Sequence, residues 1–333
     1  MVRAQKYILQ KRSRGFPKPT DFKLEREELP PLQEHEYLAE AVYLSVDPYM
    51  RAYMPKIPLN TVMLGGQVAK ITESRSSKYP RGKYVVGNFG WRTHTILRDD
   101  VTEHSGIPVV LLPDLGDLPV SLSLGVLGMP GNTAYFGFLE LCDPKPGETV
   151  VVSGAAGAVG SHVGQIAKIK GCKVIGIAGT DEKGKWLTKE LGFDSFINYK
   201  TQNVKEELLR QAPDGVDCYF DNVGGDISGV VLNQMNKYGR ISVCGAISGY
   251  NDEGVPKAPA IQNAIIVNQL KMEGFMVQRW SHRWMEGITQ NLEWIRQGKL
   301  KYQETVTNGF NNMFNGFTDM LKGANTGKAV VKV

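Results

Sequence analysis

Three glycines in the middle of the chain have the spacing of a turn that could hold a phosphate. Gly154, Gly157 and Gly160 fall within the segment SGAAGAVG at residues 153–160. A β-branched run precedes the segment, and a run with apolar residues at helical spacing follows it. Small residues let a backbone approach a pyrophosphate closely, and the start of a helix offers it free N–H groups. The segment therefore predicts a dinucleotide site, although a structural turn that binds nothing would show the same glycines.

The end of the next expected strand indicates which nicotinamide nucleotide would bind. Enzymes that use NAD usually place a carboxylate there, on the ribose hydroxyls. In this chain Gly179 and Thr180 occupy the position, and Lys183 follows at the start of the next expected helix. A small residue near a lysine suits a ribose phosphate, which needs a cation and hydrogen-bond donors. Asp181 and Glu182 could take the ribose instead or could cap the helix, but the sequence favours NADPH.

The elements that must position this turn alternate between strand-like and helix-like segments after about residue 125. Such alternation predicts βαβ units with right-handed crossovers, as in a Rossmann domain. Residues 1–124 instead carry short β-like runs broken by Pro and Gly, which predicts a mostly β domain. The predicted fold class is α/β, a doubly wound parallel sheet with a second, β domain. We expect strands at 148–152, 173–177, 195–199, 216–221, 239–244 and 328–333, and helices at 161–170, 182–191, 204–211, 227–235 and 285–297.

The ligands that a zinc dehydrogenase needs are missing from the first part of the chain. Zinc in such enzymes is held by Cys and His side chains. The first cysteine is Cys142, so the β domain offers no thiolate, and the sequence has no four-Cys cluster. Hydride transfer would then depend on positioning and on hydrogen-bond donors around a substrate oxygen. This favours reduction of a C=C bond conjugated to a carbonyl, a reaction for which weak electrophilic help is enough.

The composition is that of an ordinary globular protein of about two domains. The chain has 333 residues, 42% of them hydrophobic, and a formal net charge of +5. Its basic residues are dispersed, so we expect neither nucleic acid nor a membrane as a partner. Four cysteines without CxxC spacing are expected to be reduced. With no signal-like start and no apolar run of membrane-span length, a cytoplasmic enzyme is the expectation.

Several phrases together resemble the zinc-independent branch of the medium-chain dehydrogenase/reductase superfamily, and within it the prostaglandin reductase (leukotriene 12-hydroxydehydrogenase) family. The resemblance covers essentially the whole chain. It implies a GroES-like β-barrel catalytic domain at 1–124, a Rossmann NADP-binding domain at 125–299, a C-terminal return to the catalytic domain at 300–333, and a homodimer. The phrases are VDPYMR at 46–51, GMPGNTAYFG at 128–137, AAGAVGS at 155–161, DNVGG at 221–225 and CGAIS at 244–248.

The same resemblance assigns residues to the nucleotide. The glycine turn would hold the pyrophosphate, Lys183 and Tyr199 the ribose phosphate, and Asn222 the nicotinamide half. Tyr199 could instead pack at a strand end, Asn222 could cap a helix, and Asn325 could form a turn. The implied cofactor-binding residues are Gly157, Ala158, Val159, Gly160, Lys183, Tyr199, Asn222, Cys244, Gly245, Ala246, Ile247, Ser248, Gly249, Tyr250, Phe275, Met276, Val277 and Asn325.

For the substrate, the resemblance indicates aromatic and methionine side chains. Tyr49, Met50, Met129 and Tyr250 are the expected substrate-binding residues, and Tyr250 and Tyr49 the expected catalytic ones. The Tyr250 hydroxyl could donate to a substrate oxygen, although side chains of these types are about as often simply packed. Family members often have a tyrosine where this chain has Val267, so we do not expect proton delivery from that position.

The resemblance also implies an activity, the NADPH-dependent reduction of the C=C bond of α,β-unsaturated ketones and aldehydes. Substrates of this class include 15-oxoprostaglandins and alkenals from lipid peroxidation. Oxidation of the 12-hydroxyl of a leukotriene with NADP+ would be a slower side activity. Two alternatives stay open: an NADPH quinone oxidoreductase of the same branch, and a non-catalytic NADPH-binding protein of the crystallin type.

Overall fold

The computed structural model describes residues 2–104, 106–254 and 258–333. The chain forms two compact units, and each unit is assembled from separate stretches of sequence. The first unit comprises Met1–Gly125, Glu304–Asn325 and Ala329–Val333, and the second comprises Val126–Gln303 and Thr326–Lys328. No helix among the described residues is long and apolar enough to cross a membrane.

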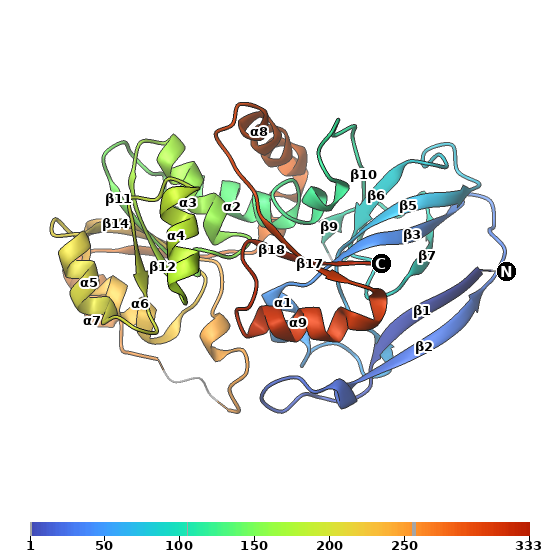
Figure 1. Cartoon of the computed structure of the whole chain (residues 1–333), viewed down its shortest axis with the longest axis horizontal. Coiled ribbons are helices and arrows are strands. Elements are labelled where there is room, and N and C mark those ends of the chain that lie inside the picture. The colour runs from blue at the N-terminus through green and yellow to red at the C-terminus, as the bar shows by residue number, and fades with distance from the viewer. Residues whose placement is uncertain (1, 105, 255–257) are drawn as a thin grey trace. The chain divides into compact units, whose positions relative to one another are not determined.

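The second unit is built on a parallel sheet, six-stranded within the described residues (Figure 1). The strand order is β13-β12-β11-β14-β15-β16, which, counted along this unit, is the 3-2-1-4-5-6 order of a Rossmann fold. The predicted α/β fold class is therefore confirmed. The strands are β11 (Thr149–Ser153), β12 (Lys173–Ala178), β13 (Ser195–Asn198), β14 (Val216–Asp221), β15 (Met235–Val243) and β16 (Lys271–Gly274).

Helices cover both faces of this sheet. On one face Leu208, Val231 and Ala264 of three helices join Val151 and Ile175 in one core cluster. These helices are α5 (Val204–Gln211), α6 (Gly225–Leu232) and α7 (Gln262–Asn268).

The opposite face is covered by helices that approach the strands closely. A Cβ on Gly176 of β12 would lie 2.9 Å from a methyl group of Leu187, and Ser242 of β15 donates to the Gly137 carbonyl over 2.7 Å. Asn132 in turn donates to the Trp284 carbonyl, which joins two of the helices. The helices are α2 (Met129–Leu139), α3 (Gly160–Ile169), α4 (Asp181–Lys189) and α8 (Trp284–Arg296).

The first unit is mostly antiparallel β-structure. One sheet has the order β2-β1-β4, and a larger one has the order β10-β6-β5-β3-β18-β17 with β7 also on β3. Trp91, Met50 and Phe317 lie in its core. The elements are β1 (Val2–Leu9), β2 (Phe22–Leu29), β3 (Glu36–Ser45), α1 (Pro48–Tyr53), β4 (Thr61–Val62), β5 (Gln67–Ser74), β6 (Tyr84–Gly87), β7 (His94–Arg98), the pair β8 (Glu103–His104) and β9 (Ile107–Pro108), β10 (Val110–Leu111), β17 (Glu304–Asn308), α9 (Met313–Leu321) and β18 (Lys328–Lys332).

The observed elements differ from the predicted ones mainly at their ends. The strand expected at 239–244 begins at Met235, because its first residue already pairs with Val216 before a register shift. The helix expected at 227–235 begins at Gly225 and ends at Leu232, where this longer strand takes over. The pattern did not predict α7 and β16, which have 7 and 4 residues and are too short to show a clear period.

Candidate cofactor site

The central strands of the parallel sheet bring the predicted nucleotide residues to one edge. β11 and β14 are neighbours, and the order of the strands reverses between them. The glycine turn follows β11 and Asn222 follows β14, so both leave the sheet at its carboxyl edge. In open α/β sheets this reversal is where ligands bind.

The glycine turn is tightly closed. Gly154 has a φ of +58°, and its carbonyl accepts the Gly157 N–H over 3.0 Å. A Cβ on Gly160, where α3 begins, would lie 2.5 Å from the Gly154 carbonyl oxygen. A larger residue at 160 would therefore force the backbone apart. This small-residue turn at a helix start fits the pyrophosphate of a dinucleotide.

A segment from far along the chain completes this turn. Gly327 forms an isolated parallel bridge with Gly157, and its N–H donates to the Ala156 carbonyl over 2.8 Å. Asn325, one of the predicted cofactor residues, stands two positions before this contact. The bridge itself could not be predicted from the sequence, because it joins residues that no local pattern relates.

A buried carboxylate, which sequence reasoning missed, organises the end of β14. Asp221 is 2% exposed and accepts five hydrogen bonds from donors on β11, β14, the following turn and α6. The sequence offers one indication of this role, a charged residue at the end of the mostly apolar strand β14. The donors are Ser153 Oγ at 3.0 Å, Tyr219 Oη at 2.9 Å, Val223 N at 3.0 Å, Gly224 N at 2.9 Å and Ser228 Oγ.

Asn222 ties the two central strands together. Its backbone N–H donates to Ser153 Oγ over 3.0 Å, and its Nδ2 donates to the Ser153 carbonyl over 2.7 Å. The cap position of α6 is Gly224, without a side-chain hydrogen bond, so Asn222 does not cap that helix. The side chain is instead fixed beside the glycine turn.

The predicted loop at 244–250 folds over the end of β14. The N–H groups of Cys244 and Gly245 both donate to the Asp221 carbonyl, over 2.8 and 3.1 Å. Ser248 donates to the Val223 carbonyl through both its backbone N–H and its Oγ. The Tyr250 hydroxyl accepts the Ala246 N–H over 3.1 Å, which bends the tyrosine back onto its own loop. The structure thus places this loop next to Asn222.

A basic corner lies at the ends of the edge strand β13 and its neighbour β12. A Cβ on Gly179 would lie 3.1 Å from the Tyr199 hydroxyl and 3.3 Å from Cε of Lys200. Tyr199 is 45% exposed, so its ring is not packed into the core. Burial lowers the pKa of Lys183 below its ordinary value, and the positive charge of Lys200 lowers it further. Tyr199 and Lys200 therefore lie over Gly179, and Lys183 is close enough to Lys200 for the two charges to interact.

Two acidic residues near this corner lie at the start of α4. Thr180 caps α4 by accepting the Lys183 N–H over 3.3 Å. Asp181 Oδ1 accepts a hydrogen bond from Asn198 Nδ2 over 2.7 Å. Asp181 and Glu182 both lie in the first turn of α4, where the positive end of the helix dipole stabilises their negative charges. The cap hydrogen bond of α4 is thus made by Thr180 and not by either acid.

The residues that follow β16 differ in how they are placed. The Phe275 ring packs against Gly137 and belongs to the cluster of Phe136, Leu141 and Trp280. Val277 is buried, whereas Met276 is 53% exposed. Their assignment to the cofactor stays a prediction.

The predicted substrate residues are divided between the two units. Met129 begins α2 and Tyr250 ends the loop described above, both in the second unit. Tyr49 and Met50 lie in α1 of the first unit. Burial, with the Asp47 carboxylate next, holds the pKa of Tyr49 well above its ordinary value, so the phenol keeps its proton.

Met50 and Val267 are placed in opposite ways. Met50 is fully buried, and its terminal methyl lies 3.1 Å from where a Cβ on Gly65 would be, so it packs in the core of the first unit. That position does not favour direct contact with a ligand. Val267 is 58% exposed on α7.

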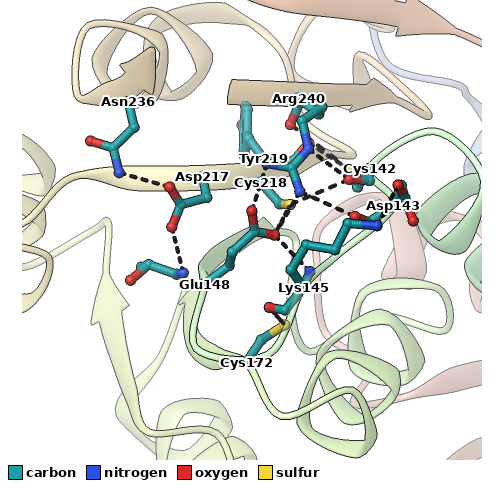
Figure 2. A network of polar contacts seen from close by, with 11 residues as sticks. Cys142, Asp143, Lys145, Glu148, Cys172, Asp217, Cys218, Tyr219, Asn236 and Arg240 are labelled. Carbon is teal, nitrogen blue, oxygen red and sulfur yellow. Dashed lines mark hydrogen bonds and ion pairs between the residues drawn. The ribbon is translucent and has the colours of Figure 1, made fainter. Parts of the chain in front are cut away.

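The opposite edge of the sheet carries a separate polar network, shown in Figure 2. Arg240 donates to both carboxylate oxygens of Glu148, over 2.9 and 2.6 Å, and to the Cys142 carbonyl over 2.8 Å. Burial raises the pKa of Glu148, but the hydrogen bonds from Arg240 and from the Lys145 N–H, together with the charge of Arg240, outweigh it, so the pKa lies below its ordinary value. The network ties the end of α2 to the amino ends of the central strands and leaves the cofactor edge free of these contacts.

Two family matches agree with this fold. Residues 5–104 match the N-terminal domain of oxidoreductase family, and residues 158–294 match the zinc-binding dehydrogenase family. Among the described residues, no group of three His, Cys, Asp or Glu side chains could hold a metal ion. Whether the reaction proceeds without zinc stays a prediction. Together with the sheet order and the glycine turn, these matches define an oxidoreductase of the medium-chain dehydrogenase/reductase superfamily.

Full-length relatives narrow this class. The chain is 50% identical over 335 aligned residues to prostaglandin reductase 1 of Sus scrofa, and all of both chains is covered. It is 39% identical to the NADP+-dependent 2-alkenal reductase of Nicotiana tabacum, covering 100% of this chain and 98% of the relative. The crystal structure of CurA in complex with NADPH from Vibrio vulnificus has a TM-score of 0.91 at 36% identity, with 99% of each chain covered. The chain belongs to the prostaglandin reductase family, as its sequence predicts.

Proposed function

We propose that this protein is an NADPH-dependent reductase of the C=C bond of α,β-unsaturated ketones and aldehydes. The observation that carries the proposal is the full-length similarity to prostaglandin reductase 1 and to a 2-alkenal reductase, combined with a strand end that suits NADPH. At that strand end a glycine stands where NAD enzymes usually have a carboxylate, and lysines lie beside it. The CurA relative was crystallised with NADPH, which supports the same cofactor.

The chain's own residues would hold the nucleotide in a defined way. The turn from Gly157 to Gly160 would hold the pyrophosphate, and Lys183 and Tyr199 the ribose phosphate. Asn222, fixed to Ser153, and the loop at 244–250 would line the path toward the nicotinamide. NADPH, when bound, supplies the hydride. The protein orients the substrate and keeps water away from it.

Two tyrosines are the proposed groups for protonation and substrate contact. Tyr49 keeps its proton because burial and Asp47 raise its pKa, so it can donate a hydrogen bond to a carbonyl oxygen as negative charge develops there. Tyr250 is the second proposed donor, and Met129 a proposed wall of the substrate site. Met50, which is buried, would anchor α1 to the core of the first unit instead of touching the substrate.

The assembly and location follow from the same family membership. We propose that the first unit is the catalytic domain, to which the C-terminal residues return, and that the protein is a cytoplasmic homodimer. β16 lies at one end of the parallel sheet, with Met272 partly exposed on it. An edge strand of this kind is able to pair with a second copy of itself.

The test uses NADPH deuterated at C4 of the nicotinamide, with a medium-chain alkenal or enone as substrate. The proposal expects NADPH consumption and a saturated product with deuterium on the β-carbon, located by NMR. Deuterium on the carbonyl carbon would indicate an alcohol dehydrogenase instead. Turnover with a quinone but not with the enone would favour a quinone oxidoreductase, and tight NADPH binding without turnover would favour the non-catalytic alternative.

A further inference from the structure

A second lysine lies at the corner assigned to Lys183. Lys200 follows Tyr199 directly after β13, and its side chain reaches over Gly179. The backbone N–H of Lys183 donates to Thr180, the residue after Gly179, over 3.3 Å. Burial lowers the pKa of Lys183, and the positive charge of Lys200 lowers it further. Lys183 and Lys200 therefore both lie near the end of β12, close enough for their charges to interact.

The turn that carries Lys200 is held in place. Asn198 is buried, and its Oδ1 accepts the Lys200 N–H over 3.1 Å. The same side chain donates to Asp181, and the Asn198 carbonyl accepts the Thr201 N–H over 3.2 Å. The backbone of Lys200 is thus fixed relative to α4, and the nearby carboxylate of Asp181 is engaged by Asn198.

Two like charges held this close repel each other, and an anion between them would remove that cost. A phosphomonoester carries about −1.5 to −2 charges near neutral pH, which matches two lysines. The ribose hydroxyl of NADH carries none. We propose that Lys200 is a further specificity-determining residue, a second cation that pairs with the ribose 2′-phosphate of NADPH together with Lys183. This inference rests on the proposed NADPH-dependent function.

The experiment measures ligand binding and does not depend on turnover. The probes are adenosine 2′,5′-bisphosphate and adenosine 5′-monophosphate, titrated calorimetrically into the full-length protein. For Lys200→Met we expect the bisphosphate to bind about threefold to tenfold more weakly, as for one partly exposed charge-assisted contact. Binding of the monophosphate should not change. Lys200→Arg should restore most of the loss, because it keeps the charge.

The matched control is Lys205→Met, which removes the same charge from an exposed position on α5. It should leave both affinities unchanged. If Lys200→Met weakens the binding of both probes equally, or of neither, Lys200 does not bind the 2′-phosphate and the inference is wrong. The proposed function would still stand. If the unaltered protein fails to prefer the bisphosphate, the proposed use of NADPH is itself wrong.

Discussion

Asn198 at the end of β13 donates to the Asp181 carboxylate in the first turn of α4, over 2.7 Å. The acid that could have bound the ribose hydroxyls of NADH is thereby part of the scaffold. We expect Asp181→Ala to lower the free energy of unfolding by about 0.5–1.5 kcal/mol, the usual worth of one hydrogen bond. The ratio of NADPH to NADH affinity should stay the same. Urea denaturation and calorimetry would measure the two quantities, and a selective loss of NADH affinity would show that Asp181 serves the ribose.

Local patterns in the sequence were enough to predict the βαβ frame, the glycine turn and Lys183 near Gly179. Each depends on residues close together in the chain, such as Gly160 beside its helix or Lys183 beside Gly179. Tyr199, by contrast, was implied by the family resemblance, and Lys200 was not predicted. The Asp221 network and the contact of Gly327 with the turn could not be predicted, because they join distant segments. The burial of Met50 depends in the same way on a core contributed by distant strands.

The closed glycine turn makes Gly160 intolerant of a side chain. In Gly160→Ala the added methyl would meet the Gly154 carbonyl oxygen at 2.5 Å, and backbone cannot move aside cheaply. We expect a loss of about 1–3 kcal/mol in the free energy of unfolding, the scale of overpacking, together with weaker NADPH binding. The control is Gly274→Ala in β16, where the nearest atom to a Cβ is 4.0 Å away. Equal behaviour of the two variants in thermal denaturation and NADPH titration would contradict this account of the turn.

The pair of Glu148 and Arg240 predicts a pH dependence of stability. Since the pKa of Glu148 is lowered on folding, its contribution is fully present above the ordinary carboxyl pKa and is lost as the pH falls below it. Glu148→Gln should cost about 1–3 kcal/mol at neutral pH and less in acid. Urea denaturation of both proteins across that pH range measures the difference, which should shrink on acidification. A constant difference would mean that the charge of Glu148 is not what stabilises the strand ends.

The cysteines predict resistance to the electrophiles that the protein is proposed to reduce. Burial, aided by nearby carboxylates, raises the pKa of Cys172 to about 11 and that of Cys244 to about 12. Their thiolate fraction at neutral pH is then smaller than that of an ordinary cysteine by about two to three orders of magnitude. Mass spectrometry after exposure to an alkenal without NADPH should show few adducts on the folded chain and many on the urea-unfolded chain. Rapid modification of Cys172 or Cys244 in the folded protein would contradict the prediction.

The bridge between Gly157 and Gly327 has a consequence for biosynthesis. The strand and helix that flank the glycine turn leave the ribosome long before Gly327 does. The parallel sheet is therefore able to form while the glycine turn still lacks its contact with Gly327. The nascent chain would therefore acquire its nucleotide late, after the C-terminal segment has emerged and reached the turn. The contact of Gly327 with the turn would in this way make cofactor binding wait until translation has passed Gly327.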